Sequence, residues 1–326
     1  MHISAKLDYK KLKNARVEKD ITQKILSEKL HINLNTLKSI ETGRTKCNKE
    51  TLKKLTDELE INIDELYIED FHLTNVISIV NSKGGSGKTS VAGSLAYALS
   101  EQNNLILLID SDMQMNLTHS FGLDKNKKNL GNALLNEESL ETYIIKTKYD
   151  QIDMVVSDLT MCSVELELLG KMQRENILKY ILEPIIKKGK YDFIIIDTSP
   201  TLGILNLNVL NASNFCIIPV TTDKFGLENI NTVLNFITNV QEYNKNLKNV
   251  KILLNKFDTR KNEITLKCKA YLQENFGAIL LSTIISIDRS MQNAQYNNVP
   301  VLDFKTNSRV AKEYRRLCKE IIKLKK

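Results

Sequence analysis

The feature that most constrains this chain is a glycine-rich segment, KGGSGKT, at residues 83–89. It follows the apolar run VISIV and precedes SVAGSLAYALS, so we expect a strand to lead through a loop into a helix. Glycines let backbone amides turn inward, and the N-terminus of the next helix adds partial positive charge. The segment therefore predicts a loop that binds an anionic group such as a phosphate.

The loop matches the pattern G-x-x-x-x-G-K-[ST], except that Ser82 replaces the first glycine and a second lysine is present. In such a loop Lys88 contacts the β- and γ-phosphates of a nucleotide, and the Thr89 hydroxyl holds Mg²⁺. The predicted nucleotide contacts are Lys83, Gly84, Gly85, Ser86, Gly87, Lys88, Thr89 and Ser90. The pattern alone does not explain Lys83.

Beyond residue 75 the chain alternates between short apolar runs and longer amphipathic stretches. The apolar runs are VISIV, LILLID, MVVS, FIIID, FCIIPV, KILLN and LLSTIIS. Strands that are apolar on both faces belong to a parallel sheet covered by helices on each side. We therefore expect an α/β fold with a doubly wound, mostly parallel sheet.

A second, smaller domain is expected, because 326 residues exceed the usual size of a single core. Before residue 70 the apolar residues recur at helical spacing in short segments, which predicts an all-helical domain. Over residues 68–75 an acidic helix end gives way to an apolar strand. We place the boundary there, between a domain of residues 1–70 and one of residues 71–326.

The helical domain contains the segment TQKILSEKLHINLNTLKSIETGR, in which Thr22 and Asn33 can cap two helices joined by the turn HIN. It resembles the Cro/C1-type helix-turn-helix. The resemblance implies that the second helix faces the major groove of DNA and the first begins near a phosphate. The residues assigned to DNA contact are Gln23, Asn33, Asn35, Thr36 and Lys38. Dimerisation or protein binding is the alternative role of this module.

The net charge of +7 is concentrated in two regions. Residues 1–56 hold 14 Lys and Arg against 6 Asp and Glu, and residues 305–326 hold 9 against 2. Two separated basic regions indicate a polyanionic partner, with a solvated helix face as the alternative.

The second lysine of the loop has an explanation in a known family. KGGSGKT resembles the deviant Walker A motif, K-G-G-x-G-K-T, of the ParA/MinD ATPases, and further resemblance extends along nearly all of residues 76–326. It implies an ATPase in which Lys88 serves its own ATP while Lys83 reaches across a homodimer to the partner's ATP. Nucleotide binding and dimerisation are then linked.

Two strand ends carry carboxylates that fit this family. LLIDSDMQMNLT resembles its D-x-D-P-Q-x-N-x-T segment, with Met113 in place of the proline, and YDFIIIDTSPTLG resembles its Walker B region. The resemblance implies that Asp110 and Asp197 support Mg²⁺ together with Thr89, and that Asp112 positions the attacking water. The carboxyl ends of strands are where ligands bind in open α/β sheets. The implied catalytic residues are Lys83, Lys88 and Asp112.

The C-terminal part resembles the family in two further segments. LLNKFDTR resembles the base-binding segment, so Asn255 is expected to hydrogen-bond adenine, and Pro300 of NVPVLDF is expected to line the adenine pocket. The positions of Ser308, Arg309, Tyr314 and Glu320 match as well. By the same resemblance a nonspecific DNA surface is expected from Arg260, Arg289, Arg309, Lys312, Arg315 and Arg316. Arg289 is out of register with the family's arginine, and a solvated final helix is the alternative.

The resemblance favours the ParA branch, which implies a DNA-partitioning ATPase that uses ATP and Mg²⁺ and is stimulated by a ParB-like partner. The helix-turn-helix adds the expectation that it regulates its own operon. An ATP-modulated transcriptional repressor shares every motif and stays open. A MinD-like membrane regulator is disfavoured, because the final segment CKEIIKLKK lacks bulky apolar anchors.

Cysteine usage and hydropathy help to exclude other classes of protein, such as metal-binding, disulfide-bonded and membrane proteins. Five scattered cysteines without a C-x-x-C pair disfavour a zinc site, a disulfide framework and the cluster of a nitrogenase-reductase-like protein; they are Cys47, Cys162, Cys216, Cys268 and Cys318. No apolar run approaches about 18 residues, and no signal-like segment follows Met1. We expect a cytoplasmic, nucleoid-associated protein without a membrane partner.

Overall fold

The computed structural model describes residues 6–7, 9–42, 49–62, 67–68, 74–260 and 263–324. The chain divides into two compact units, Met1–Leu73 and Thr74–Lys326. The expected boundary after residue 70 and Cys47 lie outside the described residues.

The first unit consists mainly of short helices packed on a small core. Its elements are β1 (Lys6–Leu7), α1 (Tyr9–Glu18), α2 (Gln23–Lys29), α3 (Leu34–Glu41), α4 (Lys49–Leu59) and β2 (Tyr67–Ile68). Thr22 Oγ1 accepts a hydrogen bond from Ile25 N at 3.2 Å, and Asn33 Oδ1 accepts one from Asn35 N at 2.9 Å. The two predicted caps are confirmed. The buried core consists of Leu12, Leu26, Leu37, Ile40, Leu52, Leu55 and Leu59. The two-residue pairing of β1 with β2 is too short to produce a sequence period.

The second unit is built on one large sheet. Its strands are β3 (Asn75–Ile79), β4 (Ile106–Asp110), β5 (Ile145–Lys146), β6 (Ile152–Val155), β7 (Phe193–Asp197), β8 (Phe215–Val220), β9 (Asn249–Phe257) and β10 (Leu280–Ser286). Their order is β10-β9-β8-β3-β7-β4-β6-β5, and every neighbouring pair is parallel except β5 with β6. Each of the predicted apolar runs overlaps a strand, so the predicted fold class is confirmed.

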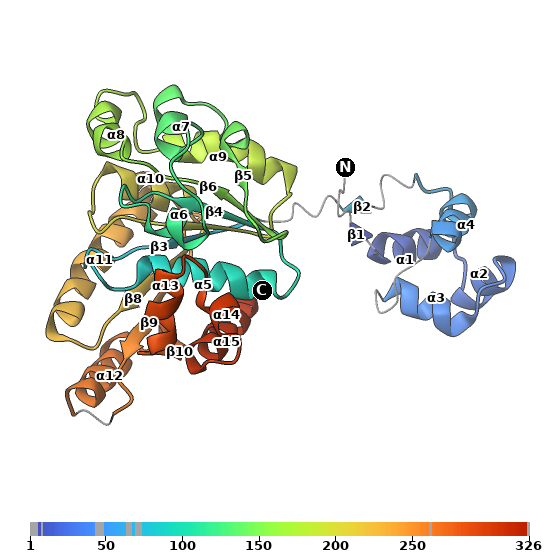
Figure 1. The fold of residues 1–326 in the computed structure, drawn as a ribbon. Coiled ribbons are helices and arrows are strands. Elements are labelled where there is room, and N and C mark those ends of the chain that lie inside the picture. The colour runs from blue at the N-terminus through green and yellow to red at the C-terminus, as the bar shows by residue number, and fades with distance from the viewer. Residues whose placement is uncertain are drawn as a thin grey trace. The chain divides into compact units, whose positions relative to one another are not determined.

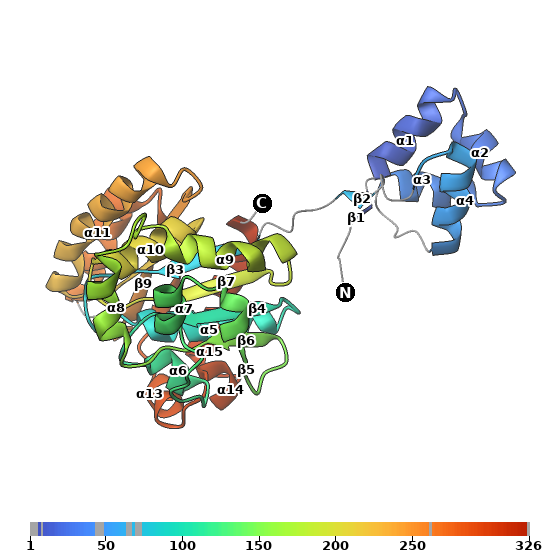
Figure 2. The same ribbon diagram turned by 90° about the horizontal axis from the view of Figure 1, so that it is seen from above.

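Helices cover both faces of this sheet (Figures 1 and 2). One face carries α5 (Lys88–Ser100), α6 (Asn116–Ser120), α13 (Arg289–Tyr296), α14 (Val301–Phe304) and α15 (Arg309–Leu324). The other carries α7 (Leu130–Asn136), a 3-10 helix (Leu140–Tyr143), α8 (Met161–Leu168), α9 (Ile177–Lys188), α10 (Ile204–Ala212), α11 (Lys224–Tyr243) and α12 (Glu263–Phe276). Alternate residues of one strand serve the two faces: Ile77 and Ile79 pack toward α5, whereas Val76 packs toward α9.

The last helix also closes an edge of the sheet. β10 is an edge strand, and the backbone N–H groups of Ser282 and Thr283 donate to the Glu320 carboxylate at 2.7 and 2.9 Å. The N–H of Ser286 donates to Glu313 at 2.7 Å. Side chains of α15 therefore satisfy edge donors that would otherwise invite another strand.

Candidate active site

The glycine-rich loop joins the carboxyl end of β3 to the N-terminus of α5. Gly85 and Gly87 have φ values of 72° and 92°, a region that L side chains rarely adopt. A Cβ on Gly87 would also lie 2.3 Å from Nδ2 of Asn255. Gly87 is thus required by conformation and by space, and it forms the N-cap of α5. The predicted strand, loop and helix sequence is what the structure contains.

The loop forms one end of a cavity of about 540 Å³. Its polar end contains the loop residues Gly84 to Ser90, apart from Ser86, together with Asp112. Away from the loop, Phe121 lies against Gly93 in the second turn of α5. The apolar side chains in the lining are Phe121, Met291, Val299, Pro300 and Val301. A polar, anion-binding end joined to an apolar end suits a ligand with phosphates at one end and a flat ring at the other. Pro300 lies in the wall where the sequence places it.

Two carboxylates stand side by side at the ends of β4 and β7. The strands are paired in register, with Asp110 opposite Asp197. The Asp110 carboxylate accepts hydrogen bonds from Thr118 N and Thr118 Oγ1, both at 2.8 Å, and from Asp112 N at 3.1 Å. Burial raises the pKa of Asp110 to about 6, although these hydrogen bonds oppose the shift. Asp110 is therefore held firmly by its own chain.

Asp197 is different, because neither of its buried oxygens has a hydrogen-bond partner among the described residues. Burial raises the pKa of Asp197 well above its usual value, and the neighbouring Asp110 raises it further. The nearby Thr89 hydroxyl and the Lys88 ammonium lower it but do not cancel the rise, so the charge of the carboxylate is only partly compensated. A buried, unpaired carboxylate is costly unless a cation compensates it. Asp197 and Thr89 offer the oxygen ligands that Mg²⁺ prefers, so the residues present fit that ion.

The loop lysine Lys88 lies among these carboxylates. Burial lowers the pKa of Lys88, and the charges of Asp197 and Asp112 oppose that shift. Asp112 lines the cavity, and its Oδ1 accepts a hydrogen bond from Gln114 N at 3.0 Å, which orients the carboxylate. The structure thus brings Lys88, Thr89, Asp110, Asp112 and Asp197 together as the sequence predicts, and their individual roles stay predictions.

Lys83 has partners within its own chain. Its Nζ forms a close ion pair with Asp223 and donates to Thr221 Oγ1 at 3.1 Å. Thr221 Oγ1 in turn donates to Asp223 Oδ2 at 2.6 Å. Both partners follow β8, the strand next to β3, so two adjacent loops are tied together. In this state the ammonium of Lys83 is compensated by a carboxylate of its own subunit.

Asn255 supports the loop from behind. Its buried Nδ2 donates to Ser86 O at 2.8 Å, and Asn255 is not among the described residues that line the cavity. The predicted contact with adenine stays a prediction, and the observed role of Asn255 is to hold the loop. The next residue, Lys256, does line the cavity; its Nζ donates to Gly85 O at 2.7 Å and its φ is 53°.

The helix-turn-helix presents an exposed face on α3. Asn35, Thr36 and Lys38 are exposed, whereas Leu37 and Ile40 are buried. The first three therefore share the outward side that a reading helix needs. Gln23, at the start of α2, forms a hydrogen bond within its own domain. Its amide donates to Glu41 Oε2 at 2.7 Å, and Glu41 is paired with Arg16 at 2.6 Å.

The basic residues of the second unit fall into two groups. Lys312, Arg316 and Arg289 are exposed. Arg315 instead forms a two-pronged pair with Glu101 at 2.6 and 2.7 Å and donates to Thr306 O at 2.6 Å. Arg315 therefore tethers α15 to the end of α5 in this structure, and its predicted contact with DNA stays a prediction.

Two more of the residues predicted to contact DNA, Arg260 and Arg309, form ion pairs or hydrogen bonds within the chain. Arg260 pairs with Asp258 at 2.5 Å. Arg309 donates to Thr259 Oγ1 at 3.0 Å and to Ile287 O at 2.6 Å. Both arginines remain exposed, so a phosphate can still reach them.

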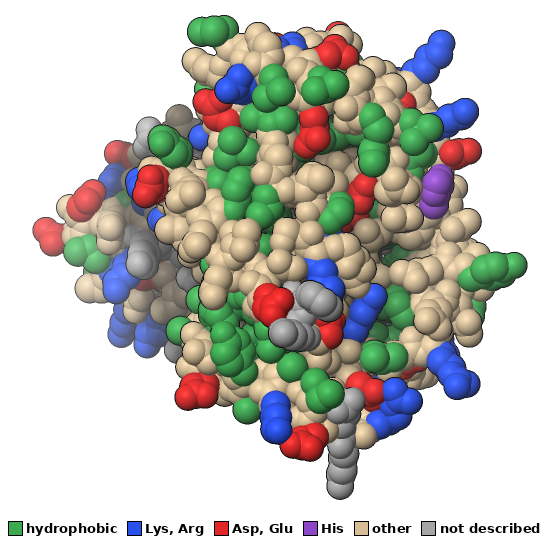
Figure 3. All heavy atoms as spheres, turned by 90° about the vertical axis from the view of Figure 1, so that its left-hand side faces the viewer, with side chains coloured by type: hydrophobic (Ala, Val, Ile, Leu, Met, Phe, Trp, Pro, Cys, Tyr) green, Lys and Arg blue, Asp and Glu red, His purple; other side chains and the backbone are tan. Residues whose placement is uncertain are grey.

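Figure 3 shows exposed apolar side chains on the side of the second unit that carries α8 and α11. Those of the segment 159–172 are here called the apolar patch. Its members are Leu159, Leu166, Leu169 and Met172, and Met172 is 89% exposed. The patch begins shortly after β6, and Leu166 lies on α8. Exposed apolar patches of this kind mark contact surfaces for other macromolecules.

Sequence reasoning overlooked Lys256 and Asp223. The signal that could have found Asp223 is the one that identified Asp110 and Asp197: a carboxylate that comes shortly after a fully apolar strand. Lys256 is the residue before the last in β9, but its neighbour Asn255 received the functional assignment.

Comparison with known proteins agrees with this geometry. A family model described as AAA domain matches residues 74–252, and one described as helix-turn-helix matches residues 12–66. The sporulation initiation inhibitor protein Soj of Bacillus subtilis is 31% identical over 252 residues, which span 76% of this chain and 97% of Soj.

Solved structures resemble the second unit. A putative plasmid partition protein of Borrelia burgdorferi bound to AMPPNP is 27% identical with a TM-score of 0.66, over 77% of this chain and 99% of that one. Cobyrinic acid a,c-diamide synthase from Mycobacterium smegmatis, with bound ADP and magnesium, is 25% identical with a TM-score of 0.66, over 77% and 94%.

Proposed function

Because the chain belongs to the ParA/MinD-type ATPases, as a ParA/Soj-like partition ATPase with an added helix-turn-helix domain, we propose that ATP closes it into a dimer that binds DNA without sequence preference. A ParB-like partner would then stimulate hydrolysis and release the DNA. The observation that carries the nucleotide site is the buried Asp197 carboxylate, which has no partner among the described residues and lies beside Thr89 and the phosphate loop.

The chemistry assigned to each side chain follows from its place. Amides of residues 84–89 and the N-terminus of α5 bind the phosphates, and Lys88 neutralises their charge. Thr89 and Asp197 would hold Mg²⁺, which neutralises charge on the phosphate oxygens as the terminal group is transferred. Asp112, already oriented by Gln114 N, accepts a hydrogen bond from the attacking water and aligns it with the phosphorus.

Dimerisation is supported by Lys83 and by the apolar patch defined above. For the trans role, Lys83 must leave Asp223 and reach the phosphates of the partner's nucleotide. The patch of Leu159, Leu166, Leu169 and Met172 would be covered in the same step. Apolar burial and charge compensation then favour the same assembly.

Two separate surfaces are assigned to DNA. The exposed side chains of α3 would read an operator, so that the protein regulates its own operon. Lys312 and Arg316 of α15 would contact phosphates of any sequence. Within the described residues no helix is both long and apolar enough to span a bilayer. The apolar face of α15 is buried in the domain, with Tyr314 and Leu317 fully enclosed, which disfavours its use as a membrane anchor.

The second candidate is a repressor whose ATPase cycle only sets its oligomeric state, and the exposed face of α3 favours it equally. Two double variants of the full chain, one with charge reversals and one with alanine substitutions, distinguish the partition ATPase from the repressor. Lys312→Glu with Arg316→Glu should weaken ATP-dependent binding to random duplex and reduce its salt slope by about 0.9 log unit per lost phosphate contact. Lys179→Glu, an exposed lysine on α9, is the charge-matched control.

Fluorescence anisotropy with operator and scrambled duplexes, at two salt concentrations, measures these effects. Asn35→Ala with Lys38→Ala should abolish operator preference and leave random-duplex binding intact. If that pair instead removes random-duplex binding while ATP hydrolysis is unchanged, the nonspecific surface lies in the first unit and the repressor function is correct.

A further inference from the structure

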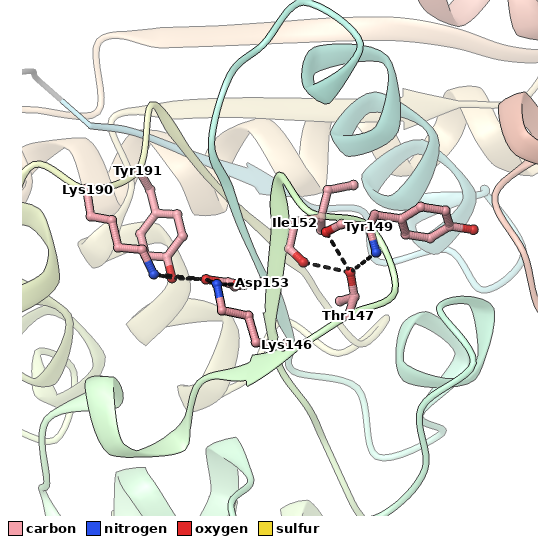
Figure 4. Close-up of polar contacts among 7 residues, drawn as sticks. All are labelled: Lys146, Thr147, Tyr149, Ile152, Asp153, Lys190 and Tyr191. Carbon is pink, nitrogen blue, oxygen red and sulfur yellow. Dashed lines mark hydrogen bonds and ion pairs between the residues drawn. The ribbon is translucent and has the colours of Figure 1, made fainter. Parts of the chain in front are cut away.

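A buried carboxylate fixes the hairpin formed by β5 and β6 (Figure 4). Asp153 of β6 receives Lys146 Nζ at 2.8 Å, Lys190 Nζ at 2.9 Å and the Tyr191 hydroxyl at 2.6 Å. Burial by itself raises the pKa of Asp153, but hydrogen bonds from these three residues outweigh it and lower the pKa. The charged carboxylate therefore ties the short edge strand to the rest of the sheet.

The turn of the same hairpin is held by Thr147. Its Oγ1 donates to Ile152 O at 2.6 Å and accepts from Tyr149 N at 3.1 Å. The ring of Tyr149 points away from the Asp153 cluster (Figure 4). A hairpin fixed at its base and at its turn thus presents one aromatic side chain to the neighbouring elements.

Tyr149 contacts three elements that surround the candidate nucleotide cavity. Its hydroxyl donates to Asp303 Oδ2 at 2.7 Å. Its ring packs edge-on against Phe121, with centroids 5.7 Å apart, and against Tyr97 of α5, 5.2 Å apart. Phe121 lines the cavity, and Asp303 belongs to α14, the helix that Pro300 caps.

We propose that Tyr149 is a positioning residue for the base of the nucleotide. Its hydroxyl anchors Asp303, and this contact holds the wall formed by Pro300 and Val301 at a fixed distance from Phe121. The inference rests on the proposed ATP site and extends it to a residue that does not touch the ligand.

The location of these contacts makes the effect specific for the base. Phe121, Pro300 and Val301 line the cavity, and the Phe121 ring lies against Gly93, in the second turn of α5 and so beyond the phosphate loop. Loosening α14 should therefore weaken the contacts of a flat ring and leave the phosphate contacts unchanged. A mutation that merely destabilised the domain would weaken both.

The test is calorimetric titration of the full chain with ATP and, separately, with inorganic tripolyphosphate, both with Mg²⁺. Tyr149→Phe keeps the ring and removes one hydrogen bond, so ATP affinity should fall about 2- to 12-fold. Tripolyphosphate affinity should stay within about 2-fold. In steady-state hydrolysis KM should rise by the same factor while kcat is unchanged.

Two further variants separate positioning from general stability. Asp303→Ala should cause at least the same loss, because it removes this hydrogen bond and also the ion pair of Asp303 with Lys148 at 3.6 Å. Adding Tyr149→Phe to Asp303→Ala should have no further effect, because the bond is already absent. Tyr143→Phe is the matched control. It removes another tyrosine–carboxylate hydrogen bond, to Glu138 at 2.5 Å, whose two residues are not among the described lining residues of the cavity.

Unchanged ATP affinity in Tyr149→Phe, or an equal loss for tripolyphosphate, would overturn the inference while the ATP site stands. If the unaltered chain bound ATP no more tightly than tripolyphosphate, the base would have no site, and the proposed nucleotide specificity would fail together with the inference.

Discussion

The pair formed by Lys83 and Asp223 predicts that dimerisation by ATP has a built-in cost. For Lys83 to act on a partner's nucleotide, the ion pair within its own subunit must open. The side chains of Lys83 and Asp223 are 22% and 49% exposed, so water still reaches the pair, and its contribution is discounted to that of a surface ion pair, about 0.2–1 kcal/mol. A dimer opens two such pairs, which makes the total about 0.4–2 kcal/mol.

Asp223→Asn should therefore strengthen ATP-dependent dimerisation about 2- to 30-fold. The dimerisation constant is measured by sedimentation equilibrium with ATP and Mg²⁺. The Asp112→Ala background is used so that hydrolysis does not dissociate the dimer during the measurement. The effect should shrink at high salt, because an exposed pair is screened. Asp258→Asn is the control, since it removes another carboxylate that is paired with a cation of its own chain, Arg260.

A double variant tests whether the effect of Asp223 depends on Lys83. In a Lys83→Ala background Asp223→Asn should have no effect, because there is then no ion pair to open. Weaker dimerisation in Asp223→Asn, or the same gain with and without Lys83, would refute the idea that Asp223 restrains the lysine.

Three other predictions follow from the site. Lys88→Ala should abolish ATP binding in calorimetric titration, since a buried ammonium beside the phosphates is lost; retained affinity would place the phosphates elsewhere. Asp112→Ala should bind ATP and Mg²⁺ but hydrolyse at least about 100-fold more slowly in a phosphate-release assay, and turnover near that of the unaltered chain would move the water-positioning role to another residue. Asp197→Asn should raise Tm in the presence of EDTA, because it removes a buried carboxylate that accepts no hydrogen bond from the described residues; the rise should be about 2–4 °C for each kcal/mol recovered. The same variant should abolish the stabilisation by Mg²⁺ with ATP. A lower Tm in EDTA would show that the carboxylate is compensated within the protein.

Much of this molecule is determined by local sequence patterns. The glycine-rich loop, the fully apolar strands and the caps at Thr22 and Asn33 each depend on residues a few positions apart, so a short window of sequence contains the whole cause. The same holds for the carboxylates Asp110 and Asp197, because the carboxyl ends of parallel strands always share one edge of the sheet.

Other features were decided only by the tertiary structure. Asn255 holds the phosphate loop from 169 residues away, Arg315 pairs with Glu101 at a separation of 214 residues, and Tyr149 reaches Asp303 at a separation of 154. Each of these side chains has several polar groups that it could bind. Which one it meets depends on strand order and on how α14 and α15 pack, and these depend on burial summed over the whole domain. Arg315 and Arg316 are neighbours in the sequence, yet Arg315 is paired with Glu101 and Arg316 is exposed. Only the tertiary structure distinguishes them.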